Sequence, residues 1–311
     1  MALFSGTAHP RLAAAIGHHL EVPVSPSQLR RFANDCLEVQ LQANCRERDV
    51  FLVQPLVPPT QEHLVELLLM IDAARGASAG RITVVMPHYA YARSDKKDEP
   101  RISIGGRLVA DLISAAGADR VLTMTLHSPQ VHGFFSVPVD HLHALHELAG
   151  HFRTGDLSNS VVISPDLGNA KEANAFARLL GVPVAAAAKQ RMADDKVVIS
   201  AIIGDVRGRD VIVLDDEIAR GSTIMELLDH LAAEDVASVR VACTHGLFTA
   251  GAIGRIEAHD EVREIVCTNT VPVPEESSAG KLTVLTVAPA LAEAMRRIHN
   301  GESVSVLFDA P

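Results

Sequence analysis

Short apolar segments rich in β-branched residues alternate with segments of helical period along most of this 311-residue chain. In residues 61–75, for example, Leu64, Leu67, Leu68 and Ile71 fall on one face of a helix. Such alternation predicts an α/β fold with mostly parallel sheets covered by helices on both faces. The expected strands are residues 50–54, 81–86, 120–125, 160–164, 210–214, 239–244, 264–268 and 282–287, and the other expected helices are 106–116, 169–180, 223–233 and 290–299.

The length of the chain suits two domains of ordinary size. No Pro- or Gly-rich linker separates the halves, so we place the boundary between Leu142 and Gly150. We expect domains at residues 1–145 and 146–297, with a C-terminal segment from about residue 298 to 311 packing back on the first. A faint repeat of helix, turn, strand and Thr/His segment suggests related halves, but chance similarity between two βα units competes with that interpretation.

Composition excludes several classes of function. Lys and Arg number 28 against 38 Asp and Glu, and a formal charge of -10 disfavours general binding of nucleic acid or anionic membranes. There is no Trp and no apolar run near the length of a membrane span, and the N-terminus lacks the pattern of a signal peptide. Four scattered cysteines are typical of reduced thiols in a cytoplasmic protein.

The most informative segment is residues 211–223, VIVLDDEIARGST. An apolar strand ends in Asp215 and Asp216, and a short loop containing Gly221 leads into a helix that begins near Thr223. Ligands bind parallel sheets at the carboxyl ends of their strands, and a helix N-terminus offers free N–H groups to a phosphate. Carboxylates suit sugar hydroxyls or Mg²⁺. Taken alone, the segment fits a turn with solvated acids equally well.

This segment resembles the ribose-phosphate loop of the phosphoribosyltransferase fold, an apolar strand followed by DDxxDTGGT. From Leu3-Phe4-Ser5-Gly6 to residues 296–305, the chain resembles the ribose-phosphate pyrophosphokinase family. The resemblance implies two phosphoribosyltransferase-like domains, each a mostly parallel sheet flanked by helices. It also implies Mg²⁺-dependent transfer of the pyrophosphoryl group of ATP to the C1 hydroxyl of ribose 5-phosphate, which gives phosphoribosyl pyrophosphate and AMP.

The resemblance assigns ATP contacts to the first half of the chain. Residues 91–97, YARSDKK, match the family's ATP loop, in which Arg93 and Lys96 would neutralise triphosphate oxygens. A solvated charged run is the plainer alternative. His127, just beyond an expected strand, matches a histidine that contacts Mg²⁺ and ATP, although most of the 15 histidines are expected to be structural.

Three further histidines, at positions 141, 143 and 146, have a spacing that could suit a metal. Leu142 and Leu145 between them suggest a helix, so we expect these histidines to be surface or packing residues.

The second half would hold the sugar phosphate and the catalytic cations. Asp166, in SPDLGN (164–169), would bind Mg²⁺, although a plain helix cap near Asn169 also fits. Lys189 and Arg191 match the basic pair of the catalytic loop and would stabilise the transferring group; an exposed basic turn is the alternative. The residues implied to bind ribose 5-phosphate are Asp215, Asp216, Ala219, Arg220, Gly221, Ser222 and Thr223.

The family is commonly hexameric, so the resemblance implies a homo-oligomer. It also places a regulatory site for phosphate or ADP at Arg46, Arg101, Ser303 and Ser305.

Two segments depart from the family pattern. The adenine-contacting RFxDGE has Asn34 and Cys36 where acids are expected, whereas Phe32 is kept and could stack on a base. A ligand donor left unpaired there costs roughly 1–3 kcal/mol. In the ribose-phosphate loop, Ala219 replaces Asp, Arg220 replaces Thr and Ser222 replaces Gly. Arg220 could itself bind a phosphate.

These departures keep two other functions open. One is a non-catalytic or weakly active relative that regulates or assembles with an enzyme. The other is a diphosphokinase with a changed nucleotide or sugar substrate. A phosphoribosyltransferase is less favoured because the ATP loop would then lack a purpose.

Overall fold

The structure is a computed structural model that describes residues 1–191, 197–273 and 280–307. The chain divides into two compact units, the first formed by Met1–His143 together with residues 287–307, and the second by Ala144–Thr286. The returning segment therefore begins at Val287 and not near residue 298. It does so because α8 (Ala288–Asn300) is one continuous amphipathic helix that packs against α1 (Pro10–Leu20).

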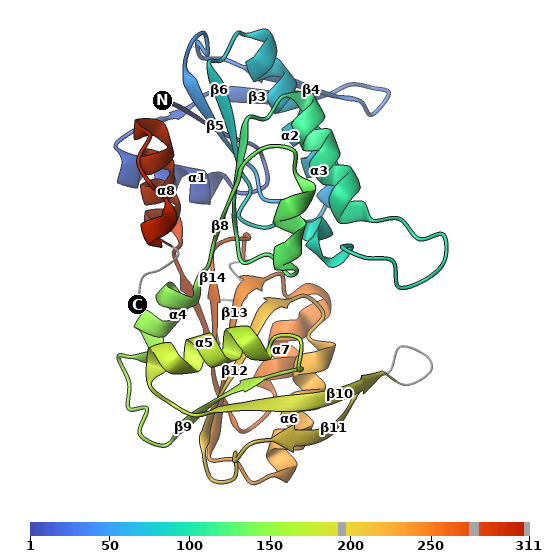
Figure 1. The fold of residues 1–311 in the computed structure, drawn as a ribbon, viewed down its shortest axis with the longest axis vertical. Helices are drawn as coiled ribbons and strands as arrows, with labels where there is room; N and C mark the ends of the chain where they lie inside the picture. Colours follow the sequence, from blue (N-terminus) through green and yellow to red (C-terminus); the bar gives the residue numbers. More distant parts are fainter. Residues whose placement is uncertain (192–196, 274–279, 308–311) are drawn as a thin grey trace. The chain divides into compact units, whose positions relative to one another are not determined.

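The first unit is built on a six-stranded sheet in the order β2-β1-β5-β6-β7-β8, with every pair parallel. Helices α1 and α8 cover one face, and α2 (Thr60–Gly76) and α3 (Gly105–Ala116) cover the other (Figure 1). A hairpin of β3 (Ser27–Arg31) and β4 (Leu37–Leu41) packs on α2. The sheet strands are β1 (Ala2–Ser5), β2 (Val24–Ser25), β5 (Asp49–Val53), β6 (Arg81–Val85), β7 (Arg120–Met124) and β8 (Val139–Leu142).

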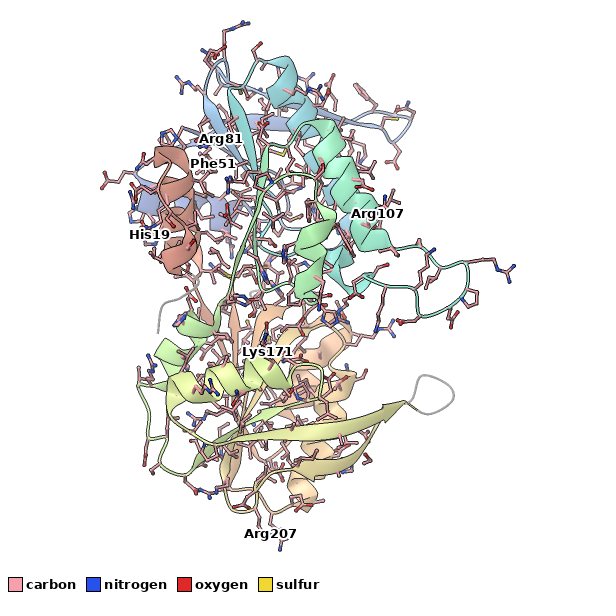
Figure 2. The ribbon with its side chains drawn as sticks, in the orientation of Figure 1. His19, Phe51, Arg81, Arg107, Lys171 and Arg207 are labelled. Atoms are coloured by element: carbon pink, nitrogen blue, oxygen red, sulfur yellow. The ribbon has the colours of Figure 1, made fainter. Side chains whose placement is uncertain are left out.

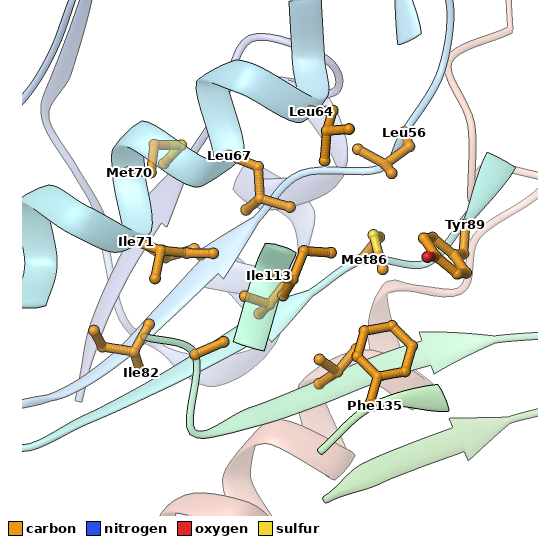
Figure 3. Close-up of a cluster of buried hydrophobic side chains, with 14 of the residues drawn as sticks. Leu56, Leu64, Leu67, Met70, Ile71, Ile82, Met86, Tyr89, Ile113 and Phe135 are labelled. Carbon is orange, nitrogen blue, oxygen red and sulfur yellow. The ribbon is translucent and has the colours of Figure 1, made fainter. Parts of the chain in front are cut away.

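The α2 side of this sheet is a continuous apolar core (Figure 3). Leu64, Leu67 and Ile71 of α2 are buried as their helical spacing predicts, while Leu68 is only partly buried. They pack with Ile113 of α3 above the sheet, and the strands present alternate apolar residues to them. This core fixes the positions of β6 and β7, whose carboxyl ends lead to candidate site residues.

The second unit has a seven-stranded sheet in the order β11-β10-β9-β12-β13-β14-β15, in which only β10 and β11 are antiparallel. Helices α4 (Leu145–Phe152) and α5 (Ala170–Leu180) cover one face, and α6 (Ser222–Ala233) and α7 (Ala252–Glu257) cover the other. The strands are β9 (Ser160–Ser164), β10 (Val184–Arg191), β11 (Val197–Ile203), β12 (Asp210–Ile218), β13 (Ser238–Gly246), β14 (Val262–Thr268) and β15 (Leu282–Leu285).

The prediction of an α/β fold with mostly parallel sheets is confirmed, and each expected strand and helix is present with small shifts of its ends. The patterns missed elements with weak local signals. Residues 184–188, VAAAA, form part of β10 although Ala is uncommon in strands, because β9 and β11 both pair with that segment. No helix in the described part of the chain is long and apolar enough to cross a membrane. The four cysteines are all free thiols.

Candidate active site

In the second unit, the acidic pair lies at the carboxyl end of β12. The strand continues through these acids because β13 pairs with it, with Asp215 opposite Cys243 and Glu217 opposite His245. The N–H of Asp216 donates to the Asp215 carboxylate at 3.0 Å. Asp216 is only 8% exposed, so its carboxylate is not a freely solvated surface group. The acids therefore belong to a structured strand end and not to a plain exposed turn.

A tight loop connects these acids to α6. The N–H groups of Phe248 and Thr249 donate to the carbonyls of Ile218 at 3.0 Å and Ala219 at 2.9 Å. The Arg255 guanidinium donates to the Arg220 carbonyl. Gly221 takes a left-handed conformation, with φ 73°, immediately before α6 begins at Ser222. The first turn of α6 presents backbone N–H groups that suit a phosphate.

Asp166 lies at the end of the neighbouring strand β9, beside the same loop. Its carboxylate accepts the N–H of Asn169 at 3.0 Å, and the Asn169 amide donates to the Leu214 carbonyl at 3.2 Å. The Asp166 carboxylate thus accepts a main-chain N–H at the entrance of α5, which is what the plain-cap alternative predicts, whereas the Asn169 side chain makes no helix-cap hydrogen bond. These bonds hold the residue 165–169 loop against the end of β12.

The charges of Asp166, Asp215 and Asp216 act on one another. Burial raises the pKa of Asp215 well above its ordinary value, and the negative charges of Asp216 and Asp166 raise it further. Among the described residues, no group of three or more His, Cys, Asp or Glu is arranged to hold a metal alone. Two or three acids that lack a complete ligand shell suit a hard cation whose other ligands are water and phosphate oxygens.

In the first unit, the segment that matches the ATP loop follows β6. It forms a short 3-10 helix, η1 (Ala90–Arg93), and the residue that follows it, Ser94, is hydrogen-bonded to the start of α3. The Gly106 N–H donates to the Ser94 carbonyl at 2.9 Å, and the Gly105 N–H donates to Ser94 Oγ at 2.8 Å. The Tyr89 hydroxyl donates to the Gly106 carbonyl at 2.6 Å. Arg93 and Lys96 are exposed, and Lys96 forms a surface ion pair with Asp98 at 3.5 Å.

His127 lies at the same edge of the sheet, just after β7. Thr125 has a left-handed φ of 45°, and its N–H donates to the Leu142 carbonyl at 2.8 Å. The Leu126 N–H donates to His141 Nε2 at 2.8 Å, which shows that His141 has a packing role. The expectation of a helix through residues 141–146 is wrong, because β8 ends at Leu142 and α4 begins at Leu145. Parallel neighbours β6 and β7 thus present Arg93 and His127 at one edge.

The segment that matches the family's adenine-contacting residues forms the tip of the β3–β4 hairpin. The Phe32 N–H donates to the Cys36 carbonyl at 2.8 Å, and the Cys36 N–H donates to Asn34 Oδ1 at 3.3 Å. Phe32 is 50% exposed, and Asp35 is engaged in an ion pair with Arg31. Asn34 thus helps to form the turn, and Phe32 offers an exposed ring.

Lys189 and Arg191 lie on β10, opposite Ile199 and Val197 of β11. Their side chains are outside the described part of the structure, so the roles expected of them stay predictions.

The four regulatory candidates do not gather within the first unit. Arg46 pairs with Ala79 ahead of β6, at the amino ends of the strands. Ser303 and Ser305 follow α8, whose last turn lies at that same edge, since Arg81 donates to the Ile298 carbonyl at 2.8 Å. Arg101, with φ 65°, lies between η1 and α3 at the carboxyl ends.

Several residues that shape these loops carried no sequence signal. Arg255 holds the Arg220 carbonyl from α7, and His141 holds the Leu126 N–H from β8. Both bind main-chain atoms that are distant in sequence, and no spacing rule could connect them. Gly106 was visible as a glycine at a helix start, but its contact with residue 94 was not.

Parallel sheets with acidic strand ends, and a loop that enters a helix N-terminus, define a phosphoribosyltransferase-like α/β protein. Residues 1–117 match the family model described as the N-terminal domain of ribose phosphate pyrophosphokinase. Residues 187–309 match the model described as the phosphoribosyl synthetase-associated domain.

Relatives agree with these matches over the full chain. A Streptomyces coelicolor protein, provisionally named ribose-phosphate pyrophosphokinase, is 74% identical over 310 residues, which cover 100% of this chain and 98% of the relative. The ribose-phosphate pyrophosphokinase of Deinococcus radiodurans is 50% identical and covers 98% of this chain and 97% of its own. The crystal structure of phosphoribosylpyrophosphate synthetase from Mycobacterium smegmatis has a TM-score of 0.91 and 39% identity, covering 96% of this chain and 99% of that chain.

The chain belongs to the ribose-phosphate pyrophosphokinase family, and it is accordingly an enzyme of the transferase and kinase class. These relatives support the enzymatic interpretation and give no support to the non-catalytic or altered-substrate alternatives.

Proposed function

We propose that this protein transfers the β,γ-pyrophosphoryl group of ATP to the C1 hydroxyl of ribose 5-phosphate. The C1 oxygen forms a bond to the β-phosphorus, the bond between that phosphorus and the α,β-bridging oxygen breaks, AMP leaves, and the hydroxyl proton is released. The observation that carries the proposal is the second-unit site, where Asp215 and Asp216 lie near the end of β12, and the strand is followed by a short loop and the N-terminus of α6.

In this proposal, the 5-phosphate binds the backbone N–H groups of residues 221–223, and the ribose hydroxyls bind the two acids at the end of β12. Arg220 is exposed beside the loop and supplies a positive charge for the phosphate. The loop is held by main-chain bonds from Phe248 and Thr249, so the phosphate meets donors that are already oriented.

The first unit would bind the nucleotide. Arg93 and Lys96 compensate triphosphate charge, and the surface ion pair of Lys96 is weak enough to be exchanged for a phosphate. Phe32 offers its exposed ring to a base. Asn34 and Cys36 replace the acids expected to accept hydrogen bonds from the adenine amino group, so we expect a weaker preference for adenine than in relatives that keep them.

The donor set suits Mg²⁺, which binds proteins through one or two carboxylates and fills its shell with water and substrate phosphates. Asp166 would contribute to a Mg²⁺ site in the second unit, and His127 would contribute to one in the first. When bound, the ion neutralises phosphate charge and orients the pyrophosphate. Lys189 and Arg191 on β10 would stabilise the negative charge of the transferring group.

We further propose a cytoplasmic homo-oligomer, hexameric in its complete form, that is regulated by phosphate or ADP. Arg46 lies at the amino edge of the first unit's sheet and Arg101 at its carboxyl edge. If Arg46, Arg101, Ser303 and Ser305 bind one regulator, more than one copy of the chain must supply them. Light scattering with and without phosphate would test this assembly.

The central experiment follows AMP formation from ATP and Mg²⁺, with and without ribose 5-phosphate. We expect sugar-dependent AMP that is abolished in Lys189→Ala. The matched control is Arg207→Ala, which removes a cation from the turn before β12, at the opposite end of that strand from the acids (Figure 2). A folded protein that binds nucleotide and forms no AMP would refute the proposal, and so would full activity in Lys189→Ala. The same assay with GTP, CTP and UTP identifies a changed nucleotide preference.

A further inference from the structure

The two-stranded ribbon of β10 and β11 has little support from the rest of its sheet. β9 pairs with β10 only from Val184 to Ala186, whereas β11 pairs with β10 as far as Arg191. Figure 1 shows both strands extending beyond the neighbouring strands of the second unit. An isolated pair of strands is only marginally stable in water. The part of the ribbon that carries Lys189 therefore needs contacts from outside the sheet to hold its position.

The pairing of the ribbon is irregular at the position of Lys189. Ala188 lies opposite Ala201 and Lys189 lies opposite Ile199, so Ser200 is an extra residue in a β-bulge. The Ser200 hydroxyl donates to the Ala188 carbonyl at 3.0 Å, which secures one side of the bulge. A bulge bends its strand and re-aims the side chains beside it. The direction taken by the chain at Lys189 depends on how this bulge is held.

The other side of the bulge is held by α6. His230, in the last turn of that helix, donates from Nε2 to the Ile199 carbonyl at 2.5 Å. The Ile199 side chain is buried in the same apolar cluster as Leu227 and Leu231 of α6. The main chain and the side chain of the residue opposite Lys189 are thus both attached to one helix.

That helix is also the one that begins at the ribose-phosphate loop. α6 starts at Ser222, and His230 follows about two turns later on the same rigid element. We infer that His230 is a positioning residue, which fixes the β-bulge of the ribbon, and with it Lys189, relative to the sugar-phosphate loop at the start of α6. This inference rests on the proposed function only for the catalytic role of Lys189. The contact itself is independent of that role.

The hydrogen bond sets a strict requirement on the side chain at position 230. The donor must reach the position of Nε2, because the Ile199 carbonyl can only accept. The glutamine amide nitrogen reaches approximately that far, whereas the asparagine amide corresponds to the nearer Nδ1 position. His230→Gln and His230→Asn thus form a matched pair that differs in the reach of its donor.

The experiment measures kcat and KM for both substrates in these variants and in His230→Ala. We expect His230→Ala to lower kcat roughly tenfold, because displacement of a catalytic cation by a fraction of an ångström has an effect of that size. Both KM values should stay within about twofold. His230→Gln should recover most of the rate and His230→Asn should not. Asp229→Ala, on an exposed neighbour in α6, should match the wild type.

Hydrogen exchange of β10 and β11 gives a readout that does not depend on activity. His230→Ala and His230→Asn should exchange these amides faster than the wild type, and His230→Gln should not. An unchanged kcat in His230→Ala, equal rates for the Gln and Asn variants, or unchanged exchange would overturn the inference. If the wild type forms no AMP at all, the proposed function fails, and the exchange comparison still decides whether His230 holds the ribbon.

Discussion

Gly106 is the position at which one added methyl group should disturb the proposed ATP loop most directly. A Cβ atom there would lie 2.9 Å from the Tyr91 carbonyl oxygen and 3.1 Å from the Ser94 carbonyl oxygen. Both obstacles are backbone atoms, so no side-chain rotation can relieve the contact. The two residues flank Arg93, which we propose to contact the triphosphate. Gly106→Ala should therefore displace the loop together with its cation.

The expected size of the effect follows from these contacts. An ordinary contact requires about 3.4 Å, so the Tyr91 carbonyl must move by roughly 0.5 Å. Overpacking of this kind costs about 1–3 kcal/mol, and the helix propensity of alanine returns at most about 1 kcal/mol. The Ser94 carbonyl also accepts the Gly106 N–H at 2.9 Å, and the same shift lengthens that bond. We expect a net destabilisation of about 1–2 kcal/mol and a KM for ATP raised several-fold.

Urea unfolding and the KM for ATP would be measured in Gly106→Ala and in Gly76→Ala. The control position is the exposed last residue of α2, where a Cβ meets nothing within 4 Å. Gly76→Ala should be stabilised by up to about 1 kcal/mol with an unchanged KM. The reasoning is refuted if Gly106→Ala is as stable as the wild type and binds ATP equally well. It is also refuted if both variants change in the same direction.

Three further substitutions test the packing and charge of the fold. Phe152→Ala should lower the free energy of unfolding measured in urea by about 3–5 kcal/mol, because this buried ring packs edge-on against Phe176 and under Arg240. Phe32→Ala, which removes a half-exposed ring, should lower the free energy of unfolding far less. Asp49→Asn should speed hydrogen exchange in α8, because Asp49 accepts hydrogen bonds from Arg81 at 2.8 Å and from His299 of that helix at 2.8 Å; unchanged exchange would contradict this anchoring role. Hydrogen bonds from Arg296 and Arg297 lower the pKa of Glu293 to about 2. A lowered folded-state pKa stabilises the protein above the ordinary pKa near 4.5 and loses that effect as the pH falls toward 2. The melting temperature of Glu293→Gln should therefore lie below the wild type at pH 6 and converge with it in acid, and a constant difference would refute the assignment.

Predictions from sequence succeeded where a segment buries one face against a helix or a sheet. The spacing of Leu64, Leu67 and Ile71 requires a helix, and these residues do line the core. β10 was missed because its alanines carry no strand preference, and its pairing comes from β9 and β11. The returning segment was placed too late because nothing local shows that the whole of α8 packs on α1.

The candidate site also contains some residues that the sequence revealed and others that it did not. Asp215 and Gly221 were found because a strand end, a turn glycine and a helix start lie together in the sequence. Arg255, His141 and His230 were not found, because each makes its contact with a main-chain carbonyl or N–H group from a distant segment. A main-chain partner leaves no residue type to match, so no sequence pattern could reveal these contacts.

The residues of the ribose-phosphate loop that depart from the family pattern are not needed to keep the shape of the loop's main chain. The loop keeps its shape through the Ala219 carbonyl, which accepts from Thr249, and through the left-handed Gly221. Ala219 contributes only its main chain to this arrangement, and Ser222 is an exposed first residue of α6. Because the proposed phosphate donors are backbone N–H groups, replacement of the side chains at 219 and 222 would remove proposed contacts with ribose and leave these N–H groups in place. Arg220→Thr should consequently raise the KM for ribose 5-phosphate while Gly221→Ala abolishes binding, and equal effects of the two would refute this division between charge and backbone.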